Sequence, residues 1–214
     1  TGSTGDIVYI ADLKFVETIS NGFVETWYDQ SGNGRNATQT TAANQPKIVS
    51  SGSLVSNGLD FDGSNDDLDM PSTIISNINS ASAFLVSKGI SGFAADCPLS
   101  ISKNSGTLLE LGTHFLTNLV NRYNNGAITL SSADGAKHLT SLVVGSSNTE
   151  SFFDGTSKGT VSTTSGYVAN GLIGSNGGLF YDGQIEEVII YDSDQGSNRV
   201  ALETNIQAAY PTLP

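Results

Sequence analysis

The sequence predicts an all-β fold, in which two antiparallel sheets pack into a β-sandwich of the concanavalin A-like jelly-roll type and one short C-terminal helix follows. Short runs of β-branched and aromatic residues alternate with turns rich in Gly, Asn, Asp and Ser. These turns recur about every 8–12 residues, which is typical of sandwiches and barrels. NNG at 124–126 and DGTSKG at 154–159 place Asn or Asp ahead of Gly, a strong hairpin signal.

The expected strands share this composition and cover most of the chain. In chain order they are residues 7–10, 23–28, 46–49, 58–63, 83–88, 98–103, 107–112, 115–123, 127–132, 138–145, 150–155, 160–164, 171–175 and 184–192. No linker rich in proline or charge divides them, and 214 residues suffice for one full core. We therefore expect a single domain over residues 1–214.

The last expected strand, 184–192, has no clean apolar face. Strict alternation places Ile185, Glu187, Ile189 and Tyr191 on one face and Glu186, Val188 and Ile190 on the other. Apolar residues on both faces indicate a central strand, with one of the glutamates reaching a polar partner or a sheet edge.

Residues 198–210 are rich in helix formers and predict the C-terminal helix. A narrow apolar face follows the spacing i, i+4, i+7 through Leu202, Ile206 and Ala209. Asp194 or Ser197 is the expected N-cap. Pro211 is expected to end the helix.

Composition limits the partners. The chain carries 21 acidic and 9 basic residues, a net charge of −12, and shows no Lys/Arg cluster of the kind that binds phosphate. We expect no nucleic acid partner, and no membrane insertion, because no apolar run approaches the roughly 20 residues of a membrane span. Cys97 is the single cysteine, which excludes an internal disulfide. The first residue is Thr rather than Met, so a processed piece of a longer protein is expected.

The segment Trp27–Gln39, WYDQSGNGRNATQ, reads as the end of a strand followed by a tight polar loop. Glycines on both sides of Asn33 favour a winding backbone with positive φ. Such a loop suits either a structural corner or a site that recognises hydroxyl groups or a cation. As a corner, Asp29, Gln30 and Asn33 are expected to bond side chain to backbone.

The acidic segment 61–69, FDGSNDDLD, is a candidate calcium site. Calcium prefers six to eight oxygen ligands on a flexible loop, and the expected ligands are Asp62, Asn65, Asp66 and Asp67. The spacing does not match an EF-hand. The alternative is a solvated hairpin whose Asp and Asn residues favour turns.

Exposed aromatic rings beside amide side chains are typical of sugar-binding sites, because the ring stacks and the amide bonds to hydroxyls. The candidates for carbohydrate binding are Tyr123, Asn124, Asn125, Asn176 and Tyr181. Phe93 and Tyr167 are weaker candidates. The alternative for each ring is packing beneath a loop.

Four segments resemble the laminin-G-like, concanavalin A-like jelly-roll domains of bacterial surface and phage virion proteins. They are 24–39 with 45–48, 57–71, 177–194 and 206–211, and they occur in the order found in that family. The resemblance implies a two-sheet sandwich on a secreted, cell-surface or virion protein.

WYDQSGNG and the ending FYDG…IQAAYP also look like the catalytic sandwich of family 54 α-L-arabinofuranosidases. Retaining enzymes of this kind need two carboxylates about 5 Å apart. The resemblance implies an acid/base Asp where this chain has Ser175 and Asn176. It also implies a nucleophilic Glu on a strand in the middle of the chain, whereas residues 115–126 contain no carboxylate; the nearest alternative is Glu110. The expected catalytic pair is therefore missing.

The sequence favours a non-catalytic carbohydrate-binding or adhesion module of a secreted, cell-surface or virion protein. The expected partner is a glycan or cell-surface polysaccharide, with other virion or surface subunits as a further possibility. Two alternatives stay open: a structural module of a virion or surface assembly, and a glycoside hydrolase.

Overall fold

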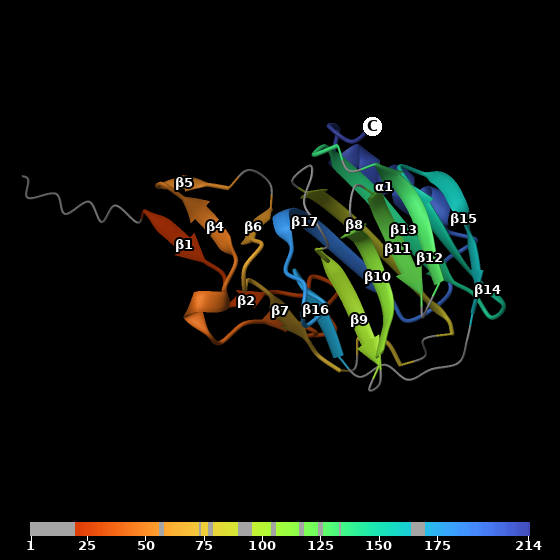
Figure 1. Cartoon of the computed structure of the whole chain (residues 1–214), viewed down its shortest axis with the longest axis horizontal. Coiled ribbons are helices and arrows are strands. Elements are labelled where there is room, and N and C mark those ends of the chain that lie inside the picture. The colour runs from red at the N-terminus through yellow and green to blue at the C-terminus, as the bar shows by residue number, and fades with distance from the viewer. Residues whose placement is uncertain are drawn as a thin grey trace, which may run out of the picture.

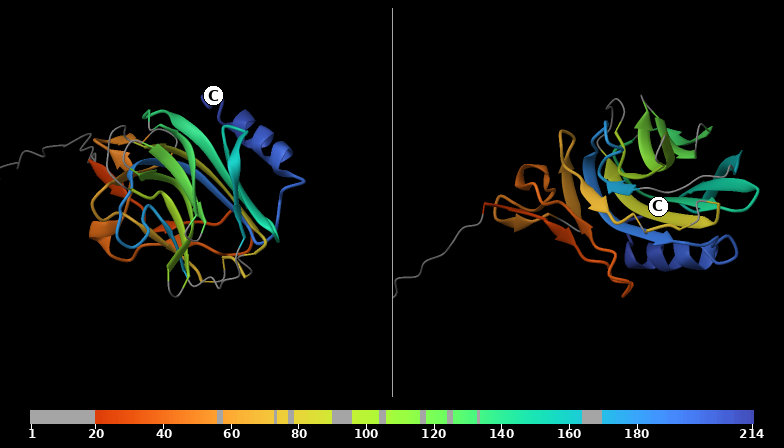
Figure 2. Two further views of the ribbon diagram at one scale, coloured as in Figure 1. Left: turned by 45° about the vertical axis from the view of Figure 1, so that its right-hand side comes forward. Right: turned by 90° about the horizontal axis from the view of Figure 1, so that it is seen from below.

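Two antiparallel sheets face each other in the computed structural model, with one helix outside them (Figures 1 and 2). The structure describes residues 20–55, 58–72, 74–76, 79–89, 96–103, 106–115, 118–123, 126–132, 134–163 and 170–214. The predicted β-sandwich with a short C-terminal helix is confirmed. The predicted strand 7–10 lies outside the described residues.

The first sheet has nine strands within the described residues. Its order is β1 (Asn21–Phe23), β4 (Lys47–Ser50), β6 (Leu59–Asp62), β17 (Asp182–Tyr191), β8 (Ala81–Gly89), β13 (Lys137–Val144), β14 (Asn148–Phe153) and β15 (Thr156–Ser162). A short strand, β5 (Ser53–Leu54), pairs with β4. At one end of the molecule, β1, β4 and β5 extend beyond the rest of the sandwich (Figure 1).

The second sheet has eight strands in the same described ranges. Its order is β12 (Gly126–Ser132), β11 (Asn118–Tyr123), β10 (Gly106–Phe115), β9 (Leu99–Lys103), β16 (Asn170–Ile173), β7 (Leu68–Met70), β3 (Ala37–Thr38) and β2 (Thr26–Trp27). A single 3₁₀ turn, Ala42–Asn44, follows β3.

The predicted strand 23–28 is wrong as a single strand, because the chain changes sheets inside it. Phe23 ends β1 in the first sheet, and Thr26 starts β2 in the second. Between them, Val24 N–H donates to the Pro46 carbonyl at 2.9 Å and the Glu25 carbonyl accepts from Gln39 N–H at 2.8 Å. This crossing carries the chain directly into the loop that follows Trp27.

The core lies between the sheets and comes from alternate residues of facing strands. Leu85 and Leu142 of the first sheet and Leu99, Ile101 and Leu109 of the second are fully buried in one cluster. Burying a side chain of this size contributes about 1.5–3 kcal/mol. Val188 and Ile190 of β17 pack against the same cluster.

A β-bulge at Glu186 corrects the alternation predicted for β17. The pairing with β8 shifts between Ile185, opposite Ser87, and Glu187, opposite Val86. Ile185 therefore joins Val188 and Ile190 on the core face, while Ile189 and Tyr191 pack on the helix face. The bulge keeps both glutamates out of the apolar space between the sheets, where an isolated carboxylate costs several kcal/mol.

Helix α1 (Arg199–Ala209) covers the outer face of the first sheet and lies along β17 and β8 (Figure 2). Ile206 is buried against Phe84, Val86 and Leu139, and Leu202 packs beside it. Ala209 is exposed, so the predicted apolar face is correct only at its first two positions. The predicted N-caps are also wrong, because Asn198 stands at that position and makes no side-chain cap bond.

Glu203 is the buried polar anchor of this helix. Ser141 Oγ donates to Glu203 Oε1 at 2.8 Å, and Arg199 forms an ion pair with the same carboxylate. The Arg199 guanidinium lies 3.8 Å from the ring centroid of Phe152, a cation–π contact. The helix is thus held to the sheet by charge as well as by apolar packing.

His138 of β13 lies between two carboxylates. Its Nδ1 is 2.7 Å from Asp154 Oδ2 and its Nε2 is 3.0 Å from Asp134 Oδ1, and the residue is buried. Carboxylates only accept hydrogen bonds, so both bonds form together only when the imidazole carries two protons. Burial lowers the pKa of His138, but the hydrogen bonds and the negative charges of Asp154 and Asp134 together raise it by more, so its pKa lies above 6.5.

Within the described residues, no helix is both long and apolar enough to cross a lipid bilayer.

We expect Glu203→Ala to destabilise the fold by about 3 kcal/mol, because it leaves Arg199 without its buried partner. Urea unfolding followed by far-UV circular dichroism measures the change. Asn205→Ala, at an exposed position of the same helix, is the matched control and should cost less than about 0.5 kcal/mol. Equal losses in the two variants would contradict the anchoring role.

We expect the free energy of unfolding to fall as the pH rises through the pKa of His138. The folded pKa is raised, so the stabilisation is complete below pH 6.5 and is lost above it. One proton corresponds to a slope of at most about 1.4 kcal/mol per pH unit. Urea unfolding at a series of pH values measures it. His138→Gln should remove this slope, and an unchanged slope in that variant would refute the assignment.

Candidate functional site

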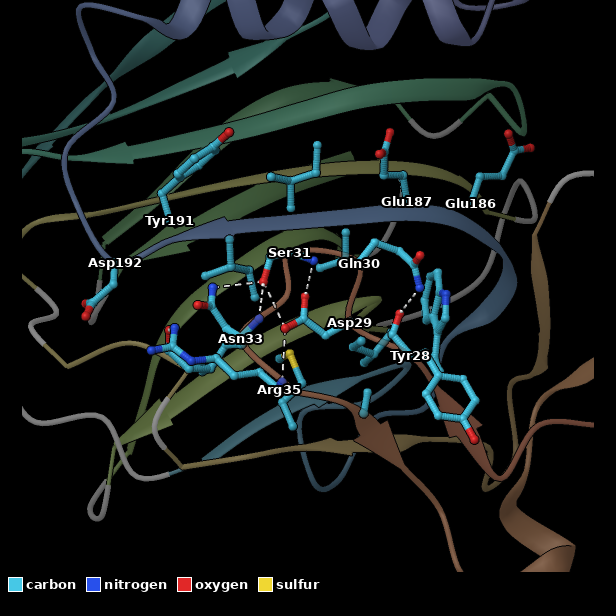
Figure 3. Close-up of a pocket in the computed structure, with 18 of the residues that line it drawn as sticks. Tyr28, Asp29, Gln30, Ser31, Asn33, Arg35, Glu186, Glu187, Tyr191 and Asp192 are labelled. Atoms are coloured by element: carbon cyan, nitrogen blue, oxygen red, sulfur yellow. Dashed lines mark hydrogen bonds between the residues drawn. The ribbon is translucent and has the colours of Figure 1, made fainter.

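A half-open pocket of about 620 Å³ lies between the Trp27–Arg35 loop and β17 (Figure 3). This size falls within the range of about 300–1,000 Å³ typical of small-molecule sites. One wall comes from Trp27–Ser31, Asn33 and Arg35, and the opposite wall from Glu186–Ser193. Ala37, Met70, Ile74 and Ile173 also line it, together with Tyr210.

The β17 wall is a strand edge. β6 pairs with β17 only from Asp182 to Ile185, whereas β8 pairs with its opposite edge as far as Tyr191. Beyond Ile185, this edge of β17 has no strand partner in the described part of the chain. Backbone N–H and C=O groups along such an edge are available to a ligand.

Asp29 organises the loop wall. Its carboxylate accepts from Ser31 N–H at 2.8 Å, from Ser31 Oγ at 2.9 Å and from Arg35 N–H at 3.0 Å. The backbone hydrogen bonds from Arg35 and Ser31 hold the pKa of Asp29 below its usual value. Gly32 and Gly34 take positive φ values of 83° and 69°, which permits the tight winding.

The expected side-chain-to-backbone bonds of the corner are confirmed for Asp29 and Gln30, whose Nε2 donates to the Tyr28 carbonyl at 3.0 Å. The Asn33 side chain instead donates to Ser31 Oγ at 2.9 Å. The two predictions for this loop are therefore compatible, because the loop is a self-bonded corner and one of its sides lines a pocket.

Trp27 and Tyr28 point to opposite sides, as expected for neighbours on a strand. Trp27 packs against the core, whereas Tyr28 is 66% exposed at the rim of the pocket. In Figure 3, Tyr28 lies on the same side of the view as Glu186 but on the loop wall, with its ring pointing away from β17, and Asp192 lies on the other side of the view. The pocket thus has an exposed aromatic ring at one end.

The carboxylates that line the pocket already take part in protein contacts. Glu186 Oε1 lies 2.7 Å from Lys137 Nζ, and Asp192 accepts from Ser76 N–H at 2.8 Å. Burial raises the pKa of Glu187, and a hydrogen bond with Tyr210 opposes that shift. Figure 3 shows Glu186 and Glu187 pointing away from the loop wall.

The tyrosines predicted to bind sugar are not exposed. Tyr123 is 2% and Tyr181 1% exposed, and both rings belong to the core cluster between the sheets. Tyr123 ends β11 beside the hairpin tip, and its side chain points into the sandwich. In this arrangement neither ring offers a face for stacking, and the expectation of exposure is wrong for both.

Asn124, Asn125, Phe93 and Tyr167 lie outside the described residues. Asn176 is half-buried, and its Nδ2 donates to Glu110 Oε1 at 3.0 Å. It does not line the pocket.

Glu110 has partners that the sequence did not reveal. Besides Asn176, Arg122 Nη1 lies 3.5 Å from Glu110 Oε2, and the Glu110 side chain is only 2% exposed. Glu110 was the alternative candidate for the nucleophile. The side chain closest to it is the amide of Asn176, which cannot protonate a leaving group.

Two of the predicted calcium ligands, Asp62 and Asp66, bond within their own loop, and the other two bond to the segment 39–43. Asp62 Oδ1 accepts from Ser64 N–H at 2.9 Å, Asp66 Oδ2 accepts from Asp62 N–H at 3.1 Å, and Gln39 bonds to Asp67. Asn65 Nδ2 donates to the Ala43 carbonyl at 2.6 Å. Such bonds are those of a turn that is tied to the segment after β3.

No three His, Cys, Asp or Glu residues gather as a metal site among the described residues. Calcium binding by Asp62, Asn65, Asp66 and Asp67 stays a prediction.

The pocket itself could not be predicted from the sequence. About 150 residues separate its two walls, and no local pattern signals that they meet. Tyr28 and Arg35 lay inside a segment singled out for its loop, but nothing pointed to Glu186–Ser193 as the opposite wall.

No model of a known protein family matches the sequence, and no curated protein is similar to it in sequence. Solved structures do resemble it. Trypanosoma rangeli sialidase in complex with sialic acid aligns with a TM-score of 0.59 and 15% identity over 85% of this chain and 31% of the sialidase. The chain therefore spans about a third of that enzyme's length.

Domain 4 of AbnA, a GH43 extracellular arabinanase from Geobacillus stearothermophilus, in complex with arabinotriose, aligns with a TM-score of 0.51 and 16% identity. The match covers 64% of this chain and 71% of that domain. At these identities the similarity shows the β-sandwich fold alone, and the laminin-G-like assignment stays a prediction.

Asp66 gives a testable pH dependence at the acidic segment. Burial and the nearby charge of Asp62 raise its pKa from 3.8 to about 6. Protonation of Asp66 therefore favours the folded state. Its ionisation should lower the free energy of unfolding, an effect that is absent below pH 3.8 and complete above about pH 6. Asp66→Asn keeps an acceptor for Asp62 N–H and should be more stable near neutral pH by about 1 kcal/mol. Thermal unfolding over this pH range tests it, and a less stable variant would contradict it.

Proposed function

We propose that the chain is a non-catalytic carbohydrate-binding module that serves adhesion on a secreted, cell-surface or virion protein, and that the pocket between the Trp27–Arg35 loop and β17 holds the glycan. One observation carries the proposal: an exposed aromatic ring, Tyr28, stands at the rim of a pocket whose walls are amide side chains and a strand edge.

The chemistry of the walls suits a sugar. The ring of Tyr28 gives an apolar face on which a sugar ring stacks. Gln30 and Asn33 each use their amide N–H₂ within the loop, and in the described part of the chain no donor reaches Gln30 Oε1 or Asn33 Oδ1. The edge of β17 beyond Ile185 adds backbone donors and acceptors. Sugar hydroxyls both donate and accept, so they match this mixture.

The carboxylates of the pocket support binding rather than hydrolysis. A retaining glycosidase needs a nucleophile and an acid/base group that face the substrate. Here Asp29 is occupied by three donors of its own loop, and Glu186 is paired with Lys137. Asp29 and Glu186 thus serve to build the walls, while Glu187 and Asp192 contact Tyr210 and Ser76.

The similar structures also support a glycan partner. The aligned sialidase is in complex with sialic acid, and the aligned arabinanase domain, from an extracellular enzyme, is in complex with arabinotriose. The acidic net charge of −12 also suits a solvated surface module.

A second function, assembly with other surface or virion subunits, is favoured by one observation. Phe23 is 50%, Ile48 38% and Leu54 75% exposed, and all three lie on β1, β4 and β5. Phe23 and Leu54 lie opposite Lys47 and Val49, which share one face of β4, so these two side chains are on the same face and Ile48 is on the other. Exposed apolar side chains on one face at the end of a sheet are typical of protein contacts. This surface is separate from the pocket residues, so both functions are compatible.

We expect Tyr28→Ala to weaken glycan binding about tenfold, because loss of the stacking face removes roughly 1.4 kcal/mol. A glycan array identifies a bound glycan, and isothermal titration calorimetry measures the affinity. Titrations in EDTA and in calcium chloride show whether calcium contributes.

Phe23→Ala is the matched control, because Phe23 is also an exposed aromatic residue but lies outside the pocket. It should bind as the wild type does. If glycan affinity falls equally in both variants, or if Tyr28→Ala keeps the wild-type affinity, the glycan does not bind in this pocket. No binding to any glycan would refute the proposed function.

A further inference from the structure

We propose that this pocket binds an acidic glycan and that the guanidinium of Arg35 holds the carboxylate of one of its sugars. The inference rests on the proposed function and names the class of ligand for the same site. It depends on the unused donors of Arg35 and on the contacts that occupy the nearby carboxylates.

Arg35 brings a positive charge to the pocket and uses little of its hydrogen-bonding capacity. It is the basic residue that lines the pocket in the described part of the chain, and it is half-buried. A guanidinium presents several N–H donors in a planar fork, and here Nη1 donates to the Ile74 carbonyl at 3.2 Å. The ion pairs of the described residues use other cations, namely Arg122, Lys137, His138 and Arg199. Arg35 therefore keeps its charge and most of its donors for a ligand.

Asp29, the acid of the same wall, is committed to its own loop. Its carboxylate accepts from Ser31 N–H, from Ser31 Oγ and from the backbone N–H of Arg35. The pKa of Asp29 is lowered mainly by the backbone hydrogen bonds from Arg35 and Ser31, and the charge of the Arg35 side chain contributes least. The bonds to Asp29 and to Ile74 thus position Arg35 without pairing its charge, and such preorganisation reduces the cost of binding.

The carboxylates of the β17 wall are turned away or occupied. Figure 3 shows Glu186 and Glu187 pointing away from the loop wall, and Lys137 lies 2.7 Å from Glu186. Asp192 accepts from Ser76 N–H at 2.8 Å and from Ser76 Oγ at 2.5 Å, and it is exposed, so water and salt screen its charge. A carboxylate that approaches the loop wall therefore meets the unpaired charge of Arg35.

The loop wall also matches the other groups of an acidic sugar. The planar fork of a guanidinium offers two parallel N–H donors to the two oxygens of a carboxylate. Gln30 and Asn33 line the same wall (Figure 3), and in the described part of the chain no donor reaches Gln30 Oε1 or Asn33 Oδ1. These atoms can accept from sugar hydroxyls. A sugar with both a carboxylate and hydroxyls thus finds a cation and acceptors on one wall.

Acidic glycans and their methyl esters test the inference with the intact chain, because an ester keeps every hydroxyl and removes only the negative charge. The two pairs are trigalacturonate and sialyllactose, each with its methyl ester, which distinguishes uronic from sialic acids. Affinities are measured by calorimetry near neutral pH in about 0.15 M salt, where a Debye length of about 8 Å limits repulsion by the net charge of the chain. In each pair that binds, we expect the acid to bind about tenfold more tightly than its ester.

Three variants locate the carboxylate. Arg35→Gln removes the charge and keeps a donor for the Ile74 carbonyl, so it should abolish most of the preference for the acid. Arg35→Lys keeps the charge but not the planar fork, so it should retain part of that preference. Lys158→Gln on β15 removes a positive charge at an exposed position outside the pocket and should leave the preference unchanged. Binding of the ester shows that the pocket of each variant is intact.

Equal or tighter binding of the esters would overturn the inference while leaving the proposed function intact, and so would binding of neutral glycans when neither acid binds. An unchanged preference in Arg35→Gln would also overturn it, because the carboxylate would then be held elsewhere. An equal loss in Lys158→Gln would do the same, because the preference would then come from the overall charge of the chain. If no glycan on an array binds, the proposed function fails, and the inference fails with it.

Discussion

The bulge at Glu186 in β17 is the constraint on which the rest of the structure depends. A strand with glutamates at two successive positions cannot alternate regularly in the centre of a sandwich without burying one of them between the sheets. The register shift beside Glu187 avoids this and keeps Ile185, Val188 and Ile190 in the core. It also coincides with the end of the pairing to β6. The strand therefore leaves the bulge with one open edge, and that edge is a wall of the pocket.

The same strand connects the pocket to the helix. Glu186 pairs with Lys137, whose Nζ lies 5.8 Å from the centroid of the Tyr210 ring, and Tyr210 bonds to Glu187. Tyr210 directly follows α1, whose position is fixed by Glu203, Ser141 and apolar packing on Phe84. The charges at the back of the pocket are thus held by contacts on the outer face of the sheet. A pocket supported in this way is largely preformed, which reduces the cost of ordering on binding.

An open strand edge can cause aggregation, because its unpaired backbone groups pair readily with other chains. The Trp27–Arg35 loop lies opposite this edge and shields it without pairing to it. Asp29 keeps the loop in shape through bonds to Ser31 and Arg35, so the loop does not need the strand for its own stability. The result is a pocket with polar walls between the loop and the open edge of β17.

Local patterns in the sequence determined the fold class and most of the elements, because strand alternation, turn residues and helix formers act over a few neighbouring positions. They also identified the loop around Asn33 and the side-chain-to-backbone bonding of Asp29 and Gln30. Only the tertiary structure decided the rest. The burial of Tyr123 and Tyr181, the partners of Glu110, and the meeting of Tyr28 with Glu186–Ser193 depend on which strands face each other. Those contacts join residues far apart in the chain, and periodicity within one strand carries no information about them.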